Sequence, residues 1–330
     1  MNIIAYKLPG DCVKHIYKAG KGQDSALNPT RDSFIISPFD CYQKSYIYTL
    51  ETRLTKIPED VVEKNHLVNS FRSLTRGEYG RYINYIKNFL EEDEDRKVVA
   101  ARNVIQPIKI DPDEMFESLC SYYPDSFVFF VSTGEFGTWI GASPELLLKK
   151  SENELESISL AGTRKAGTQG EWDQKNLLEQ KIVTRHIKTI FQKYGIEPKD
   201  AKSQTLRAGN IEHIMTPVRG TVSSPAEIEK LLRELSPTPA LCGYPKDEAS
   251  KIIERYEGNR SLYGGYCGPV WKNGDFRFNV VIRCAFLETS TKAILFAGGG
   301  ITSLSDINNE WEETEHKLDT LRKVFESKEF

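Results

Sequence analysis

Segments with the periodicity of strands alternate with segments with that of helices along the whole chain, and this alternation constrains the fold more than any other feature. Short apolar runs bounded by turn residues predict strands at 33–37, 45–50, 97–101, 126–131, 138–141, 145–149, 155–160, 276–287 and 293–297. Apolar residues at helical spacing predict helices at 79–90, 175–194, 224–235, 246–256 and 305–325. No Gly/Ser-rich or Pro-rich linker separates them. We therefore expect a mixed α/β (α+β) fold in which residues 1–330 form a single large domain.

The charge balance limits the kinds of partner. The formal net charge is −3 and no run of Lys or Arg occurs, so we expect no binding to nucleic acid or to a membrane. We see no signal peptide at the start and no apolar run of about 20 residues, the length that spans a bilayer. The 6 cysteines are scattered without a Cys-x-x-Cys pair, which is typical of reduced thiols in the cytoplasm. These features predict a cytoplasmic enzyme that holds a small anionic substrate with a few placed cations or a metal.

The predicted helix at 305–325 is the most informative element. At about 100° per residue, Glu310, Glu313 and Lys317 lie within about 60° of one another. They border an apolar stripe that includes Ile307 and Leu321. Such a cluster is typical of ion pairs at the edge of a core. Two carboxylates and an ammonium beside a core also suit a hard cation that, with the lysine, binds a substrate carboxylate. The pattern alone leaves both interpretations open.

Three glycines, at 298–300, precede this helix in the run AGGGI. They follow a predicted strand and precede an expected N-cap at Ser305. Glycines in such a turn let backbone N–H groups approach an anion, although a tight turn alone also requires glycine. Arg283 lies inside the apolar run 278–285, where a guanidinium is costly to bury without an anion. We expect Arg283 either in a structural ion pair or as a bidentate clamp for a carboxylate.

Three further polar side chains lie in apolar surroundings. Lys97 opens the buried run 97–101, where a lysine can be held neutral as a base or can extend to solvent from the end of a strand. Glu145 follows a proline turn, where a carboxyl can act as a general acid or cap the turn. His213 is the only histidine in an apolar-flanked strand, and the histidines show no zinc-type spacing.

Ordered blocks of sequence resemble the chorismate-binding enzyme family, which includes isochorismate, salicylate, anthranilate and aminodeoxychorismate synthases. The blocks are KVVAAR at 97–102, GASPE at 141–145, LAGTR at 160–164, NLLE at 176–179, HIMT at 213–216, PTPAL at 237–241, YGG at 263–265, IRCA at 282–285, AGGGI at 297–301 and EWEET at 310–314. The resemblance covers residues 97–317, whereas residues 1–90 match poorly.

The resemblance implies both a fold and a site. The implied fold is a single domain of two stacked antiparallel β-sheets with helices on the outside, as in anthranilate synthase. Mg²⁺ is the implied cofactor, held by Glu179 and Glu313 with support from Glu310. Lys97 is the implied base and Glu145 the implied general acid. The other implied residues line a chorismate-binding cleft, and they are Ala161, Thr163, His213, Leu241, Arg283, Gly298, Gly299 and Lys317.

A few positions select a branch of this family. Ala161 stands where some aminodeoxychorismate synthases carry a lysine nucleophile. The run IVTRHI at 182–187 resembles the water-using branch, and Lys97 matches the base that activates water there. Ala240 resembles isochorismate synthases, because salicylate synthases tend to carry Thr at this position. The resemblance therefore implies an isochorismate synthase, which is an isomerase. A salicylate synthase, which also eliminates pyruvate, and a non-catalytic chorismate-binding protein are the alternatives.

The resemblance also bears on partners. An enzyme of the water-using branch needs no glutamine amidotransferase subunit, and we expect a monomer or weak homodimer. The product of an isochorismate synthase can serve menaquinone or siderophore synthesis, and the sequence leaves this open. Gln180 stands where the family commonly has His, and Lys165-Ala166 replaces a Pro-Arg pair. These departures bear on substrate placement more than on the class of reaction.

Overall fold

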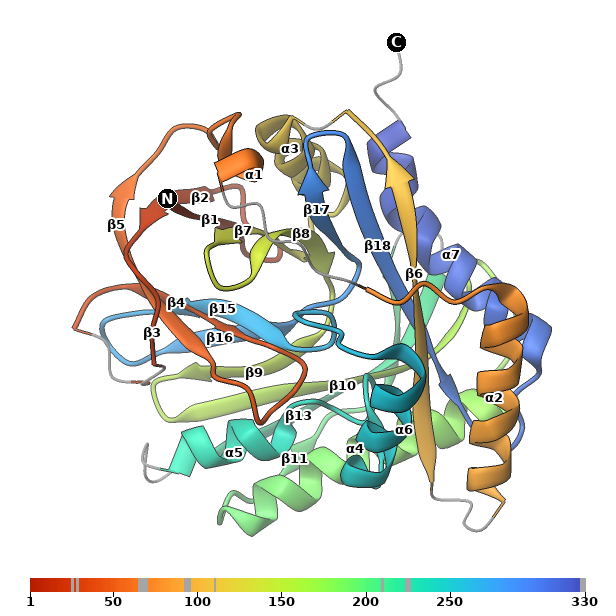
Figure 1. The fold of residues 1–330 in the computed structure, drawn as a ribbon. Helices are drawn as coiled ribbons and strands as arrows, with labels where there is room; N and C mark the ends of the chain where they lie inside the picture. Colours follow the sequence, from red (N-terminus) through yellow and green to blue (C-terminus); the bar gives the residue numbers. More distant parts are fainter. Residues whose placement is uncertain are drawn as a thin grey trace.

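The computed structural model describes residues 1–24, 27, 30–64, 71–91, 96–109, 111–208, 211–222 and 227–326. Its strands form two layers in which every described pairing is antiparallel (Figure 1). The first sheet has the order β5 (Tyr46–Arg53), β2 (Lys14–Ala19), β1 (Asn2–Lys7), β7 (Phe127–Thr133), β8 (Gly137–Ser143), β17 (Cys284–Thr289), β18 (Lys292–Ile301), β6 (Lys97–Pro107) and β14 (Gly243–Tyr244).

The second sheet shares β5 with the first. Its order is β3 (Gln23–Asp24), β5, β4 (Ser33–Ser37), β15 (Tyr266–Val270), β16 (Phe276–Val280), β9 (Leu146–Ser151), β10 (Glu154–Lys165) and β13 (Ile211–Thr221), with β11 (Lys199–Asp200) and β12 (Gln204–Ala208) both on β13. Because β5 pairs with β2 in one layer and with β3 and β4 in the other, it joins the two layers at an edge.

The side-chain alternation of β7 shows how the layers pack. Phe127, Phe129 and Val131 belong to the main core, which also contains residues of β4, β9 and β16 from the second sheet. Val128 and Phe130 belong to a second core with residues of α1, α3 and α7. Successive side chains of a strand point to opposite faces, so a strand covered on both faces is apolar at every position. The seven residues of β7 are accordingly all buried.

Helices cover the outer faces of the two sheets. They are α1 (Val61–Lys64), α2 (Arg76–Leu90), α3 (Pro112–Tyr122), α4 (Gln174–Lys193), α5 (Ile228–Leu235), α6 (Lys246–Glu257) and α7 (Ile307–Glu326). Figure 1 shows α4 and α5 below the second sheet and α7 beside β18 of the first. The implied architecture of two stacked antiparallel sheets with helices outside is thus confirmed. No helix in these described ranges is long and apolar enough to cross a bilayer.

Most predicted elements are present, with two differences that affect the site. The run 276–287 was expected as one strand, but it is two strands, β16 and β17, separated by residues 281–283, and Arg283 in this break has a φ of +46°. A left-handed residue cannot continue a strand, so Arg283 lies in a sharp break. The glycines at 298–300 were expected in a turn, but they lie inside β18 and pair with 99–101 of β6.

Helix ends also differ from expectation. The carboxylate of Asp306, rather than Ser305, accepts from the backbone N–H groups of Asn308 and Asn309 and so caps α7. Helix α3 was missed, although Asp111 caps it and Pro112 occupies its first turn. The predicted start of a helix at residue 224 lies outside the described residues, and α5 is described from Ile228.

Candidate active site

A cavity lies at the junction of the two sheets and brings together most of the predicted site. The predicted residues that line it are Glu145, Ala161, Thr163, Glu179, His213, Leu241, Arg283, Gly298 and Lys317. A second, more polar cavity contains Glu310 and Glu313 in its lining and shares Thr163 with the first. Gly299 and Lys97 line neither cavity. Of the expected metal residues, Glu179 thus lies in the first cavity with the expected substrate residues, whereas Glu310 and Glu313 lie in the second.

Arg283 and His213 form a buried pair in the first cavity. Arg283 Nη2 lies 2.7 Å from His213 Nε2, and His213 Nδ1 lies 2.8 Å from the carbonyl oxygen of Gly162. With Nδ1–H donating to that carbonyl, Nε2 accepts from the guanidinium. Burial and the charge of Arg283 lower the pKa of His213 to about 3, which keeps the ring neutral.

The guanidinium of Arg283 has capacity left for an anion. Its Nη1 is buried and has no hydrogen-bond partner. Arg283 has no carboxylate partner among the described ion pairs, so a structural ion pair, one of the two expectations for this residue, is not what the structure contains. A buried donor without a partner is costly unless a ligand satisfies it. Arg283 therefore presents an anion-binding group to the cavity.

Glu145 is a buried carboxyl on the same cavity, just before β9. Its backbone carbonyl accepts from Val280 N and from Asn279 Nδ2, which fixes its position between β8 and β16. Its side-chain Oε1 lies 3.5 Å from the Thr238 hydroxyl. Burial raises the pKa of Glu145 to about 8, although Lys97 opposes the shift. This shift favours the protonated form of Glu145, which can donate a proton.

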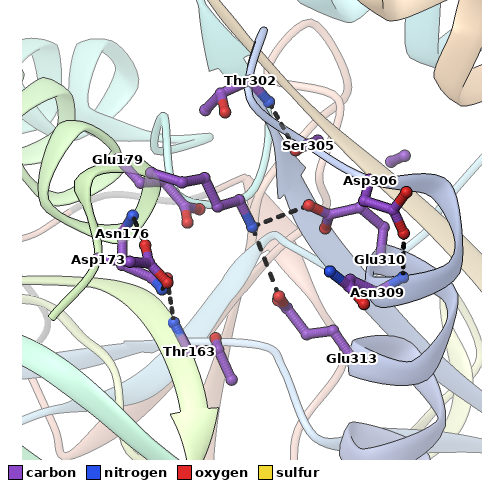
Figure 2. Close-up of polar contacts among 12 residues, drawn as sticks. Thr163, Asp173, Asn176, Glu179, Thr302, Ser305, Asp306, Asn309, Glu310 and Glu313 are labelled. Carbon is purple, nitrogen blue, oxygen red and sulfur yellow. Dashed lines mark hydrogen bonds and ion pairs between the residues drawn. The ribbon is translucent and has the colours of Figure 1, made fainter.

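Thr163 is held in the cavity wall by the first turn of α4. Asp173 caps this helix, because its carboxylate accepts from Asn176 N at 2.8 Å. The same carboxylate orients the Asn176 amide, whose Oδ1 accepts from Thr163 N at 2.9 Å. Figure 2 shows this chain of contacts from Asp173 to Thr163. Asp173, the residue that caps α4, thus also positions Thr163 through Asn176.

Three carboxylates face one another from two helices. Glu179 comes from α4, and Glu310 and Glu313 come from α7 (Figure 2). Glu179 is paired with Lys97 at 2.8 Å, and Glu313 is paired with Lys317 at 2.8 Å. The helical position of Glu310, Glu313 and Lys317 beside the apolar stripe of α7 is confirmed, since Glu310 is only 2% exposed.

Lys175, which was not predicted as a site residue, pairs with both Glu310 and Glu313 of α7. Its Nζ lies 2.9 Å from Glu310 Oε1 and 3.6 Å from Glu313 Oε2. Burial raises the pKa of Glu310, and the neighbouring charge of Glu313 raises it further. Burial acts in the same sense on Glu313, but Lys317 and Lys175 outweigh it and hold its pKa below the usual range.

The glycines of β18 leave room for these carboxylates. A Cβ built on Gly300 would overlap Glu179 Oε1 and would lie 2.6 Å from Glu179 Cδ. A Cβ on Gly299 would lie 3.0 Å from Glu310 Oε2 and 3.3 Å from Glu313 Oε1. Only glycine permits carboxylate side chains to lie this close to a strand. The glycine run therefore provides clearance for the acidic cluster.

The donor set fits Mg²⁺ in its chemistry. Carboxylate oxygens are the ligands that this hard cation prefers, and Glu310 Oε2 is buried without a hydrogen-bond partner. Among the described residues no three His, Cys, Asp or Glu side chains are grouped closely enough to ligate one ion. Each of the three carboxylates instead contacts a lysine, so metal binding requires these ion pairs to rearrange.

Lys97 lies behind one of these carboxylates. Its side chain is fully buried, and its Nζ contacts Glu179 Oε1 at 2.8 Å without the alignment of a hydrogen bond. Glu179 lines the first cavity whereas Lys97 does not. A proton can pass between Lys97 and the cavity only if Glu179 moves or a water lies between them.

A family model described as "Chorismate binding enzyme" matches residues 39–326 of the chain. The chain belongs to the chorismate-binding enzyme family. Among curated members of the family, it is similar to isochorismate synthase EntC of Escherichia coli strain K12, at 34% identity over 243 residues. It is also similar to isochorismate synthase MenF of Bacillus subtilis strain 168, at 32% identity over 278 residues. These matches cover 69% and 79% of this chain but only 62% and 58% of the relatives, so the chain spans less than two thirds of their length.

Solved structures of family members have the same fold. The structure titled putative isochorismate synthase DhbC of Bacillus anthracis superposes with a TM-score of 0.81 at 22% identity. The superposition covers 97% of this chain and 95% of the DhbC chain. Anthranilate synthase component I of Streptococcus pneumoniae superposes with a TM-score of 0.69 at 16% identity over 97% of this chain and 89% of its own. At these identities the likeness establishes the anthranilate-synthase-like fold of this family member.

Several residues that build the site were missed from the sequence. Tyr263 and Phe296 line the first cavity, and Lys175 lines the second. For Lys175 the available signal was its spacing of one helical turn before Glu179, which places both on one face of α4. Tyr263 lies within a block already recognised as a family motif, so its position in the site could have been expected.

Proposed function

We propose that this family member is an isochorismate synthase, an isomerase that converts chorismate to isochorismate with Mg²⁺. The observation that carries the proposal is one cavity that combines the free guanidinium donor of Arg283, the ammonium of Lys317 and the buried carboxyl of Glu145, whose pKa burial raises. Chorismate carries two carboxylates and a hydroxyl that must leave as water, so this set matches both its charges and its chemistry. The names of the two curated relatives support the same activity.

In the proposed reaction, water adds at C2 of chorismate and the C4 hydroxyl leaves. Lys97 is assigned as the base that takes a proton from the water, and Glu145 as the acid that protonates the departing hydroxyl. One water is consumed and one is released, so the product is an isomer of the substrate. The neutral His213 holds Arg283 in place to bind the enolpyruvyl carboxylate. These fixed groups supply orientation and charge stabilisation.

The ring carboxylate is assigned to the side of the cavity near α7. Lys317, whose Nζ donates to the carbonyl of Gly298 at 2.7 Å, lies at that side and offers a cation. Glu179 and Glu313, supported by Glu310, are the residues that would hold Mg²⁺. When bound, the ion would neutralise and orient the ring carboxylate. Ala161, Thr163 and Leu241 complete the wall around the ring, and Gly298 and Gly299 allow the carboxylate to approach β18.

The remaining proposals concern the compartment in which the enzyme works and its partners. We propose that the enzyme works in the cytoplasm, because all of its cysteines are free thiols. We expect no glutamine amidotransferase subunit, because water rather than ammonia is the nucleophile. We also expect a monomer or weak homodimer that binds neither nucleic acid nor membranes.

Product analysis tests the proposed function. Purified protein is incubated with chorismate and Mg²⁺ in the absence of ammonia, and the products are separated by chromatography. We expect an equilibrium mixture of chorismate and isochorismate, no pyruvate, and complete inhibition by a chelator. Release of pyruvate would instead indicate a salicylate synthase, and binding of chorismate without turnover would indicate a non-catalytic protein.

A further inference from the structure

The carboxylates of α7 are held by a lysine that the proposed reaction does not use. Lys175 lies in the first turn of α4, one turn before Glu179. Its ammonium reaches across to α7, where it contacts Glu310 and Glu313. Figure 2 shows these two carboxylates of α7 opposite Glu179 of α4. A single cation therefore bridges two of the three carboxylates assigned to the metal.

All three proposed metal ligands act on this ammonium. Its Nζ lies 2.9 Å from Glu310 Oε1 and 3.6 Å from Glu313 Oε2, and Glu179 follows Lys175 by one turn on the same face of α4. The lysine nitrogen therefore lies where the carboxylates of Glu310 and Glu313 both attract a cation. Two carboxylates three residues apart on one helix repel each other, and Lys175 offsets that repulsion.

We propose that Lys175 is an internal counter-ion of the metal site, which holds Glu310 and Glu313 together without metal and is displaced when Mg²⁺ binds. The inference rests on the proposed function, because it assumes that these carboxylates bind Mg²⁺. A divalent ion and an ammonium repel each other strongly at contact distance, so both cannot occupy the same carboxylate oxygens. Lys175 acts here as a positioning residue.

The surroundings allow Lys175 to leave. Its side chain is 16% exposed and borders the polar cavity, whose lining also includes Asp173, Asp306 and Glu312. A displaced ammonium can therefore reach water and other carboxylates. Lys317 differs, because it pairs with Glu313 and is also anchored to the carbonyl of Gly298. Of the two lysines that contact Glu313, Lys175 is thus the one free to exchange with a metal.

The test compares Mg²⁺ binding by calorimetry, and thermal unfolding with and without Mg²⁺, in the wild type and in Lys175→Met. We expect Lys175→Met to bind Mg²⁺ about tenfold more tightly or better, because a competing unit charge is removed. We expect its unfolding temperature to be lower than that of the wild type in chelator and to rise more when Mg²⁺ is added. Mg²⁺ affinity equal to or weaker than wild type would overturn the proposal.

Two further variants serve as controls. Lys193→Met changes an exposed lysine of the same helix that pairs with Glu234, and we expect it to behave as the wild type. Lys175→Arg keeps the charge, and we expect no gain in Mg²⁺ affinity; a tenfold gain would overturn the proposal. If Lys175→Met unfolds in chelator, it is prepared and titrated with Mg²⁺ present throughout, with competition by a chelator of known affinity.

A last variant separates the two proposals. Glu313→Gln should abolish Mg²⁺ binding in the wild-type background. If the wild type binds Mg²⁺ through Glu313 and Lys175→Met changes nothing, the counter-ion role fails while the proposed function stands. If Lys175→Met tightens Mg²⁺ binding but no isochorismate forms, the counter-ion role stands while the proposed activity fails. Absence of any Mg²⁺ binding would overturn both.

Discussion

Replacing Gly300 with alanine should damage the site through one methyl group. The new Cβ would lie 2.6 Å from Glu179 Cδ and 2.7 Å from Lys97 Cε. Carbon atoms pack at about 3.5–4.0 Å, so the Glu179 carboxyl must retreat by about 1 Å. A misplacement of about 1 Å in a catalytic site costs roughly 10²-fold in rate. That factor corresponds to about 2.7 kcal/mol of lost transition-state stabilisation.

The assay for Gly300→Ala measures kcat/KM with chorismate and Mg²⁺, together with the affinity for Mg²⁺ and the unfolding temperature. We expect a fall of about 10²-fold in kcat/KM and weaker Mg²⁺ binding, with about 1–3 kcal/mol lost in stability from overpacking. Gly134→Ala is the matched control, because a Cβ there meets no atom within 4 Å. If Gly300→Ala keeps wild-type kcat/KM and Mg²⁺ affinity, then the close approach of Glu179 to β18 is not needed for activity.

Three further predictions concern buried charged groups. Because Glu145 must be protonated and its pKa is about 8, kcat/KM should fall as pH rises through about 8, and Glu145→Gln should remove this limb and cost about 10²-fold or more. A pH profile that persists in Glu145→Gln would refute the assignment. Arg283→Lys should raise KM about tenfold or more, since an ammonium cannot replace a bidentate fork; an unchanged KM would contradict the clamp. Arg260→Met should cost about 3–5 kcal/mol in denaturant unfolding, because it leaves the carboxylate of Glu257 buried and unpaired. The exposed Arg219→Met should cost less than about 1 kcal/mol, and equal costs would refute the argument.

The strands and helices were predictable where the pattern of apolar residues decides them. The continuous apolar run of β7 and the helical stripe of α7 both correspond to elements of the structure. The break at Arg283 was not predictable, because the apolar run continues through it and only tertiary packing imposes its positive φ. The glycines at 298–300 were placed in a turn because glycine disfavours strands, but in this fold the need for space beside acidic side chains outweighs that preference.

The individual residues of the site were more predictable than the contacts between them. The position of Glu310 and Glu313 at the edge of an apolar stripe indicated that they face the interior. The spacing of Lys175 one turn before Glu179 places both on one face of α4, but the helical pattern does not state that this face meets Glu310 and Glu313 of α7. Likewise, the pairing of Lys97 with Glu179 joins residues of a strand and a helix that are far apart in the chain. The roles of these residues came from the family resemblance.

In the proposed reaction, this site adds water at C2 of chorismate and removes the C4 hydroxyl. The most direct test runs the reaction with Mg²⁺ in water enriched in oxygen-18 and analyses the product by mass spectrometry at early times. Early sampling is needed because the reverse reaction also labels chorismate. We predict isochorismate that carries one oxygen-18 at the C2 hydroxyl. Isochorismate without the label, or no isochorismate at all, would contradict the account.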